Sequence, residues 1–241
     1  MKKKLDILLF AAHPDDAEIS AGGSIARAVK QGYQVGIADL TAGELGSRGS
    51  AEIRERESAE ASKVLGIHER VNLGLADGFF EQNESSLRLV IQTIRAFKPE
   101  IIICNAPSDR HPDHGKASKL VSEAAFYSGL RKIETKDAGG HSQEQWRPKA
   151  VYHYMQDYYL KPDFVVDISE FWDQKLEVLK CYSSQFFDPK SAEPSTPISG
   201  QEFFDFLKGR AIQTGRPAGF LLGEGFITAR TPGIEDFFDL I

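Results

Sequence analysis

The chain has 241 residues, of which 41% are hydrophobic and 27% charged, and its formal net charge is -6. This composition is typical of a soluble globular protein, and the length suits one α/β domain over residues 1–241. The acidic balance argues against a nucleic-acid partner, which would require a basic face. The apolar run that follows Lys2-Lys3-Lys4 is interrupted by Asp6, so it is too short for a signal peptide or a membrane span. We therefore expect a cytoplasmic protein with no membrane attachment.

The first predicted unit is a strand over residues 5–11 and a helix over about residues 17–31. Between them stands the polar stretch Ala12-His13-Pro14-Asp15-Asp16, at a strand-to-helix turn. In an open α/β sheet the carboxyl ends of the strands form the ligand crevice, and a helix N-terminus there offers free N–H groups. The alternative for either aspartate is simple capping of the helix.

The second unit is a strand over residues 33–40, a glycine-rich loop over 41–50 and a helix over 51–65. The loop lacks the Gly-Lys-Ser/Thr of a phosphate cradle, so we interpret it as a functional loop beside the site. The helix is heavily charged, which indicates a solvated face with i,i+4 pairing. Arg54 is the exception, because it lies in the first turn and points toward the strand ends. A strand over 71–75, a turn at Asp77-Gly78 and a helix over 84–97 follow.

A second polar turn repeats the first. A strand over residues 101–104 leads into Asp109-Arg110-His111-Pro112-Asp113-His114, and helical periodicity resumes at Ala117. Catalytic zinc takes three protein ligands from His, Asp, Glu or Cys and keeps one position open. His13, Asp16 and His114 supply such a set, which leaves Asp15, His111 and Asp113 free for proton chemistry and for supporting contacts.

The C-terminal third, about residues 150–241, is predicted to complete the sheet and to carry most of the aromatic content. The segment 133–149 is an irregular surface excursion, in which we expect His141 to be solvated. Strands are predicted over 150–155, with His153 as a hydrogen-bonded structural residue, and over 164–168. Ser169 is expected to cap a helix that runs to about residue 182, a loop covers 186–197, and a helix covers 201–213. Exposed aromatic patches mark interfaces, so a homo-oligomer formed partly by this third is expected.

Strands that alternate with helices predict the fold class. We expect a Rossmann-like three-layer α/β sandwich with a mostly parallel central sheet. Its active site would lie at the carboxyl ends of the strands.

The pair Ala12-His13-Pro14-Asp15-Asp16 and His111-Pro112-Asp113-His114 resembles the LmbE-like or PIG-L zinc deacetylases, which remove the acetyl group from N-acetylglucosamine conjugates. The resemblance covers most of the chain. It extends to Thr41-Ala42-Gly43-Glu44, to Arg54 with Glu57, to residues 72–75 and to residues 223–226. Residues 163–169 and 182–186 look more like the bacillithiol-pathway branch, the N-acetylglucosaminyl-malate deacetylases.

The resemblance implies roles for the site residues. Asp15 matches the family's general base, a role that its position beside Asp16 also favours. His111 would stabilise the oxyanion or protonate the leaving amine, with Asp113 holding its imidazole in orientation. Asp109 stands where some family members have a tyrosine, so His111 must supply more of the oxyanion stabilisation here.

Substrate contacts are also implied. Arg54 matches a family arginine that contacts substrate, and Glu44 matches a position that meets sugar hydroxyls. Arg110 adds a cation at the same rim, where it suits either a surface salt bridge or an anionic aglycone such as malate. The family resemblance further implies a hexamer or a trimer.

Three alternatives stay open at this stage. The enzyme can act on another N-acylated amino sugar. The chain can be a non-catalytic sugar- or nucleotide-binding α/β module, although its turns lack the glycines of a phosphate cradle. Iron can replace zinc, because a His-Asp-His set accommodates both ions.

Overall fold

The computed structural model describes residues 4–186 and 192–240. Lys2, Lys3 and residues 187–191 of the predicted loop lie outside this range. One seven-stranded sheet runs through the molecule, in the order β3-β2-β1-β4-β5-β7-β6. Its strands are β1 (Ile7–Ala11), β2 (Val35–Asp39), β3 (Glu69–Asn72), β4 (Ile101–Cys104), β5 (Ala150–Tyr154), β6 (Phe164–Asp167) and β7 (Gly223–Thr228).

All neighbouring strands from β3 to β5 are parallel, and β7 is antiparallel to both β5 and β6. β1 is central, since Ile7 is in register with Val35 of β2 on one side and with Ile101 of β4 on the other. The chain order of the strands reverses at β1 and β4. Ligands of open α/β sheets bind outside the carboxyl ends of the strands at such a reversal.

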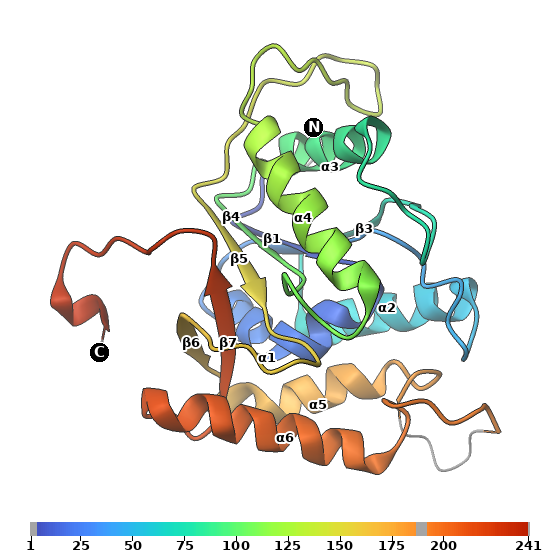
Figure 1. Cartoon of the computed structure of the whole chain (residues 1–241), viewed down its shortest axis with the longest axis vertical. Helices are drawn as coiled ribbons and strands as arrows, with labels where there is room; N and C mark the ends of the chain where they lie inside the picture. The colour runs from blue at the N-terminus through green and yellow to red at the C-terminus, as the bar shows by residue number, and fades with distance from the viewer. Residues whose placement is uncertain (1–3, 187–191, 241) are drawn as a thin grey trace.

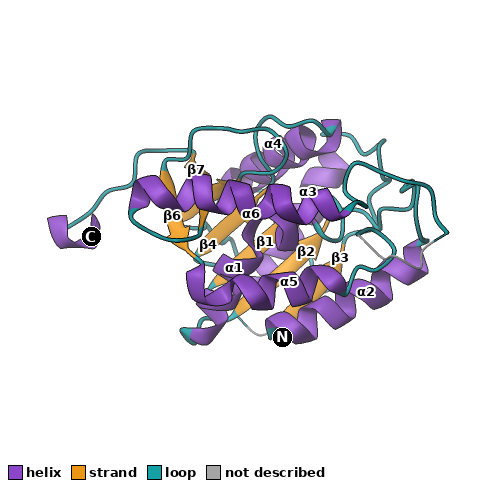
Figure 2. Cartoon of the chain, turned by 90° about the horizontal axis from the view of Figure 1, so that it is seen from below, coloured by secondary structure: helices purple, strands orange, loops and turns teal. Residues whose placement is uncertain are grey.

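Helices cover both faces of the sheet (Figures 1 and 2). They are α1 (Asp16–Lys30), α2 (Ala51–Leu65), α3 (Glu84–Phe97), α4 (Pro112–Tyr127), α5 (Trp172–Lys180) and α6 (Gln201–Gly215). Alternate strand residues point to opposite faces, so Leu9 packs in the core under α1, α2, α5 and α6, whereas Leu8 and Phe10 pack under α3 and α4. The predicted three-layer α/β sandwich with a mostly parallel sheet is confirmed.

Two local predictions were wrong. β3 ends at Asn72 rather than running to residue 75, because the Asn72 side chain accepts from the amide of Gly74, where the chain turns at a φ of +66°. Ser169 does not cap a helix. Its hydroxyl donates to Asp167 Oδ1 at 2.6 Å, and α5 begins only at Trp172, after a 3-10 turn over Ser169–Phe171.

Among the described residues, no helix combines the length and the apolar character that crossing a bilayer requires.

Candidate active site

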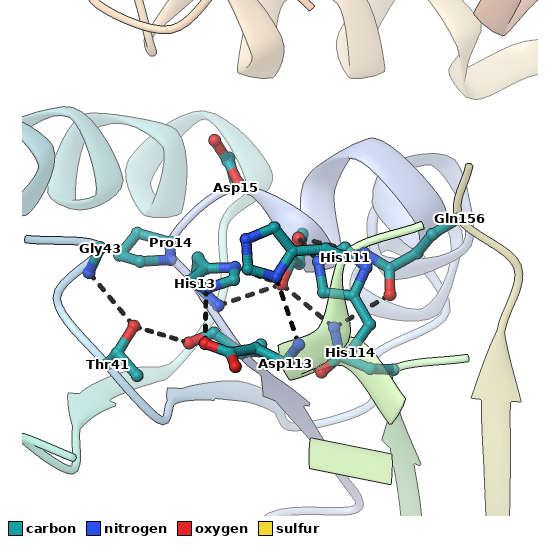
Figure 3. A network of polar contacts seen from close by, with 12 residues as sticks. His13, Pro14, Asp15, Thr41, Gly43, His111, Asp113, His114 and Gln156 are labelled. Carbon is teal, nitrogen blue, oxygen red and sulfur yellow. Dashed lines mark hydrogen bonds and ion pairs between the residues drawn. The ribbon is translucent and has the colours of Figure 1, made fainter. Parts of the chain in front are cut away.

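The turn after β1 has an unusual backbone at Asp15. This residue has a φ of +110°, outside the range that non-glycine residues normally adopt, and such strain costs about 1–3 kcal/mol. Its side chain makes no capping hydrogen bond to α1, so the capping alternative does not apply to Asp15. In Figure 3 its carboxylate points away from the neighbouring imidazoles. The strained turn therefore sends Asp15 and Asp16 in different directions.

Asp16, the first residue of α1, is held by three elements. Its Oδ2 accepts from the backbone amide of His13 at 3.0 Å and from Asn105 Nδ2 at 3.1 Å. Its Oδ1 accepts from Gln156 Nε2 at 3.0 Å. Burial opposes ionisation, but the contacts with His114 and His13 outweigh it and hold the pKa of Asp16 well below its usual range. Asp16 is thus a fixed, ionised carboxylate between the ends of β1, β4 and β5.

Three imidazoles lie beside one another at this end of the sheet, and Figure 3 shows them as His13, His111 and His114. His13 Nδ1 lies 3.4 Å from Asp16 Oδ2, and His114 Nε2 lies 3.2 Å from Asp16 Oδ1. The His111 ring lies 4.7 Å from the His13 ring and 5.1 Å from the His114 ring, measured between centroids. The fold therefore brings His114 beside the predicted ligands His13 and Asp16, which lie about 100 positions earlier in the sequence.

Two groups of side chains at this site could hold a divalent metal ion, and Asp16 belongs to neither group. Within the described range, His13, His111 and His114 offer ligand atoms within 4.8 Å of one another, and so do His13, Asp77 and Asp113. His13 Nε2 is buried without a hydrogen bond, although Asp77 Oδ1 lies 3.0 Å away. Imidazole with carboxylate suits zinc and also iron. His111, Asp77 and Asp113 are thus further candidate ligands, and both groups share His13 with the predicted set.

Asp109 orients one imidazole. Its Oδ2 lies 2.5 Å from His114 Nδ1, and its Oδ1 accepts from the amide of Tyr158 at 2.7 Å. A carboxylate on one ring nitrogen fixes the tautomer and leaves the other nitrogen available to a metal ion. The residue that replaces the family's tyrosine here therefore aims His114 Nε2 at Asp16.

Asp113 does not hold His111 as predicted. Its carboxylate accepts from the Gly78 amide at 2.8 Å and from Lys116 Nζ at 3.0 Å, and lies 3.5 Å from His13 Nε2. The link to His111 runs through the backbone instead, since the Asp113 amide donates to His111 Nδ1 at 3.3 Å. This occurs because His111 is the N-cap of α4.

The capping hydrogen bond determines which ring nitrogen of His111 carries the proton. A neutral imidazole that accepts at Nδ1 bears its proton on Nε2. Burial and the neighbouring His13 and His114 lower the pKa of His111, which favours this neutral form. His111 lines the cavity described below, so it can present an N–H donor there.

Asp15 forms a buried ion pair with Arg54. Arg54 Nη2 lies 2.9 Å from Asp15 Oδ2 and also donates to the Pro14 carbonyl. Burial is the main effect and raises the pKa of Asp15. Arg54 lowers this pKa in part, Asp16 raises it again, and the resulting pKa is about 7. Gly43 is required beside the pair, because a Cβ there would collide with the Arg54 guanidinium. Arg54, predicted to contact substrate, thus reaches the cavity while paired with Asp15.

The other two predicted substrate residues behave differently. Arg110 Nε pairs with Asp157 Oδ2 at 2.8 Å in a partly exposed ion pair, and both residues line the cavity. Glu44 does not line this cavity. Its side chain accepts from the Asp77 amide at 2.8 Å, because the loop turns so that Leu45 and the two residues after it face the cavity instead. The assignment of Glu44 to sugar hydroxyls stays a prediction, and in this structure its carboxylate is engaged by the Asp77 amide instead.

Most of these groups, but neither Glu44 nor Asp113, line one cavity of about 490 Å³. Its polar end carries the imidazoles, Asp15 and Arg54, and its other wall is apolar, with Phe203, Phe206 and Leu207 of α6. This size is within the usual range for small-molecule sites.

Sequence reasoning missed three residues of the site: Asp77, Asn105 and Gln156. A positional signal existed for two of them. Asn105 directly follows β4, and Gln156 comes two residues after β5, so both lie at the carboxyl edge of the sheet. Asp77 belonged to a predicted turn, and only its contact with His13 gives it a place in the site.

Comparisons with known proteins indicate the family. Residues 8–125 match the PIG-L family model, described as GlcNAc-PI de-N-acetylase. The diacetylchitobiose deacetylase of Thermococcus kodakarensis is 28% identical over 230 residues, which cover 91% of this chain and 81% of that protein. The probable N-acetyl-alpha-D-glucosaminyl L-malate deacetylase 2 of Bacillus cereus is 28% identical over 195 residues, 74% of this chain and 83% of that protein.

A solved structure is also similar over nearly its full length. The crystal structure of a conserved protein of Thermus thermophilus superposes with a TM-score of 0.85 at 34% identity, covering 97% of this chain and 98% of that one. The matched family region contains both polar turns together with Arg54. With its fold and its motifs in agreement, the chain belongs to the PIG-L family of de-N-acetylases.

Proposed function

We propose that this N-deacetylase is a zinc-dependent hydrolase whose substrate is an N-acetylglucosamine conjugate with a small anionic aglycone, N-acetylglucosaminyl-malate. One observation carries the proposal. The turns after β1 and β4 bring His13 and His114 to within 3.4 Å and 3.2 Å of Asp16, beside the buried Asp15–Arg54 pair. Metal-assisted amide hydrolysis combines these two features, a cation site and an adjacent base.

His13, Asp16 and His114 would hold the ion. When bound, zinc supplies Lewis-acid polarisation of the acetamide carbonyl. Asn105 and Gln156 fix the Asp16 carboxylate, and Asp109 fixes the His114 ring, so the ligands keep their orientation.

Asp15 is the general base in this proposal. It takes a proton from the water that adds to the carbonyl carbon, and its pKa of about 7 suits proton transfer near neutral pH. His111 donates the N–H at Nε2 to the developing oxyanion. The C–N bond then breaks, and the proton held by Asp15 passes to the leaving amine. Acetate and the free amino sugar are the products.

Arg110 supports the malate aglycone. Its ion pair with Asp157 is partly exposed at the cavity rim, and such pairs contribute only about 0–1 kcal/mol. The guanidinium can therefore exchange Asp157 for a substrate carboxylate at little cost, in a bidentate geometry that lysine cannot offer. Similarity to the Bacillus cereus malate deacetylase points the same way.

The test is amine release by purified protein from N-acetylglucosaminyl-malate, from N-acetylglucosamine and from diacetylchitobiose, each with zinc or iron added after chelation. We expect turnover to be fastest with the malate conjugate, and Arg110→Ala to raise its KM but not that of N-acetylglucosamine. His114→Ala should lose metal and activity together. Equal KM changes for charged and neutral substrates would contradict the anionic aglycone, and release without metal would contradict the zinc chemistry.

A further inference from the structure

The segment 182–186, which resembles the bacillithiol-pathway branch in sequence, packs beside the catalytic cavity. It follows α5, which lies next to α2 in Figures 1 and 2. Both ends of the segment are buried. The Tyr182 hydroxyl donates to Glu18 Oε1 at 2.7 Å. The Phe186 ring stacks on the Phe203 ring at 5.8 Å between centroids. The segment is therefore anchored in the core at both ends.

Glu57 of α2 holds the middle of this segment. Its Oε1 accepts from the Ser184 amide at 2.7 Å and from the Ser183 hydroxyl at 3.2 Å. Its Oε2 accepts from the Ser184 hydroxyl at 2.7 Å. These bonds satisfy a buried carboxylate, which would be costly to leave without partners. They also fix the backbone directly before Gln185.

The side-chain amide of Gln185 has an orientation that its neighbours determine. Its Nε2 donates to the Arg48 carbonyl at 2.9 Å and to the Ser184 hydroxyl at 2.9 Å. A backbone carbonyl can only accept, so the amide nitrogen and not the amide oxygen faces Arg48. Gly49 is required beside this contact, because its φ is +70° and a Cβ there would lie 2.8 Å from Ser184 Oγ. The glycine-rich loop therefore orients Gln185.

The oxygen of the same amide is left available. Among the described residues, no donor bonds to Gln185 Oε1, whereas both N–H bonds of Nε2 are used inside the protein. The Gln185 side chain lines the catalytic cavity, as do Asp15 and Arg54. An amide in this state offers the cavity an acceptor and no donor. It can recognise a ligand only through a hydroxyl or an N–H group.

We propose that Gln185 Oε1 accepts a hydrogen bond from a hydroxyl of the substrate's sugar ring. The inference rests on the proposed function, because it requires a sugar that carries the acetamide in this cavity. A sugar hydroxyl needs an acceptor when the ring leaves water, and the wall formed by Phe203, Phe206 and Leu207 offers none. A substrate without that hydroxyl leaves the buried amide oxygen unpaired and is rejected. Gln185 is thus a specificity-determining residue for hydroxylated amino sugars.

Deoxy substrates test this contact in the full-length, metal-loaded enzyme. kcat/KM is measured for an N-acetylglucosamine conjugate and for a set of monodeoxy analogues, each lacking a different hydroxyl of the sugar. The enzymes are the wild type and Gln185→Met, whose side chain has a similar length but no amide. For one analogue the wild type should lose about 10-fold in kcat/KM, as expected of one hydrogen bond. Gln185→Met should treat that analogue and the parent substrate alike, because the two changes remove the same interaction.

Ser184→Ala tests how Gln185 is positioned. It removes the hydroxyl that joins Gln185 Nε2 to Glu57, so discrimination against the same analogue should fall to about 3-fold. Ser183→Ala is the matched control, because it removes only a 3.2 Å bond to Glu57 and leaves Gln185 with both of its partners. This control should discriminate like the wild type. Circular dichroism and thermal unfolding establish that each variant is folded.

The outcomes separate the two proposals. Equal discrimination by the wild type and Gln185→Met against every analogue would overturn the role of Gln185 and leave the proposed function intact. If Gln185→Met does not fold, Ser184→Ala decides, and wild-type discrimination in that variant would count against the contact. A wild type that releases no amine from any N-acetylglucosamine compound would overturn both proposals.

Discussion

Asp15 shows how a single residue carries both strain and charge. Its positive φ turns its carboxylate toward Arg54, while the next residue, Asp16, faces the imidazoles. Strained backbone of this kind persists only where surrounding contacts enforce it, and here the buried Arg54 does so through both the carboxylate and the Pro14 carbonyl. The residue is thereby held as a base next to the ligand set without joining it.

The variant Asp15→Asn tests this role. The amide cannot accept the proton, so we expect kcat to fall by about 10²–10⁴. Metal content, measured by atomic absorption, should stay at the wild-type level because His13, Asp16 and His114 remain. Asp137→Asn, at an exposed position far from the cavity, is the matched control and should retain activity. Near-normal turnover of Asp15→Asn would remove Asp15 from the mechanism.

His153 is a structural histidine, as the sequence predicted. Its Nδ1 lies 2.9 Å from the Asn105 carbonyl and 3.0 Å from Ser118 Oγ, behind the site. Burial lowers its pKa, and the Asn105 carbonyl opposes this only in part. The unfolded chain therefore binds a proton at His153 more readily than the folded chain does. The contribution of the neutral imidazole to stability is full above the unfolded pKa of about 6.5, and it falls as the pH drops through that value.

We expect the difference in unfolding free energy between wild type and His153→Gln to depend on pH. Urea unfolding at pH 7.5 and at pH 5.5 measures it. The wild type should lose more stability on acidification than the variant, which has no imidazole to protonate at this position. Parallel losses in both proteins would show that His153 does not titrate between these pH values.

At the scale of the elements, α1 approaches its neighbours through two glycines in its middle. A Cβ on Gly23 would lie 2.6 Å from Ile168 Cβ, whereas a Cβ on Gly22 would lie 3.3 Å from Lys175 Cγ, a tight contact but not a collision. Glu224 of β7 accepts from the Gly23 amide at 3.1 Å and from Lys175 Nζ at 2.6 Å. The glycines therefore allow close packing of the helix that begins at Asp16.

Gly23→Ala should destabilise the protein. Overpacking costs about 1–3 kcal/mol, which exceeds the gain of about 1 kcal/mol in helix propensity. Gly22→Ala has the same gain in helix propensity, and its added Cβ meets Lys175 Cγ only at 3.3 Å. Its unfolding free energy should therefore equal or exceed that of the wild type. Urea midpoints of the two variants make the comparison, and equal stability would contradict the packing argument.

At the scale of the whole molecule, the site joins segments that are remote in the chain. The turns after β1 and β4 meet only because these strands are neighbours, and Gln156 adds the end of β5. A metal ion held by His13, Asp16 and His114 would link the first two turns in the folded state, and the unfolded chain has no such site. Binding to the folded state alone stabilises by mass action.

Zinc at 100 times its dissociation constant should therefore add about 2.7 kcal/mol, which raises Tm by about 5–10 °C for a chain of this length. Calorimetry of chelated and zinc-loaded protein measures the shift. Asp16→Asn should show little response to chelation. A wild-type Tm that is the same with and without metal would contradict an ion at this site.

The sequence by itself determined the helices and strands and the position of the reactive side chains at the strand ends. Apolar periodicity is local, so the strands, the helices and the α/β class could be predicted with boundary errors of a few residues, as at β3. Both polar turns were identifiable because each follows its strand directly, and the carboxyl ends of parallel strands share one edge of the sheet.

Only the tertiary structure decided the contacts between turns. The pairing of Arg54 with Asp15, the orientation of His114 by Asp109, and the displacement of Glu44 onto the Asp77 amide all join residues that no local pattern relates. Side-chain partners depend on which strands are neighbours and on how each loop turns. These are properties of the packed chain, which the periodicity of a single segment does not contain.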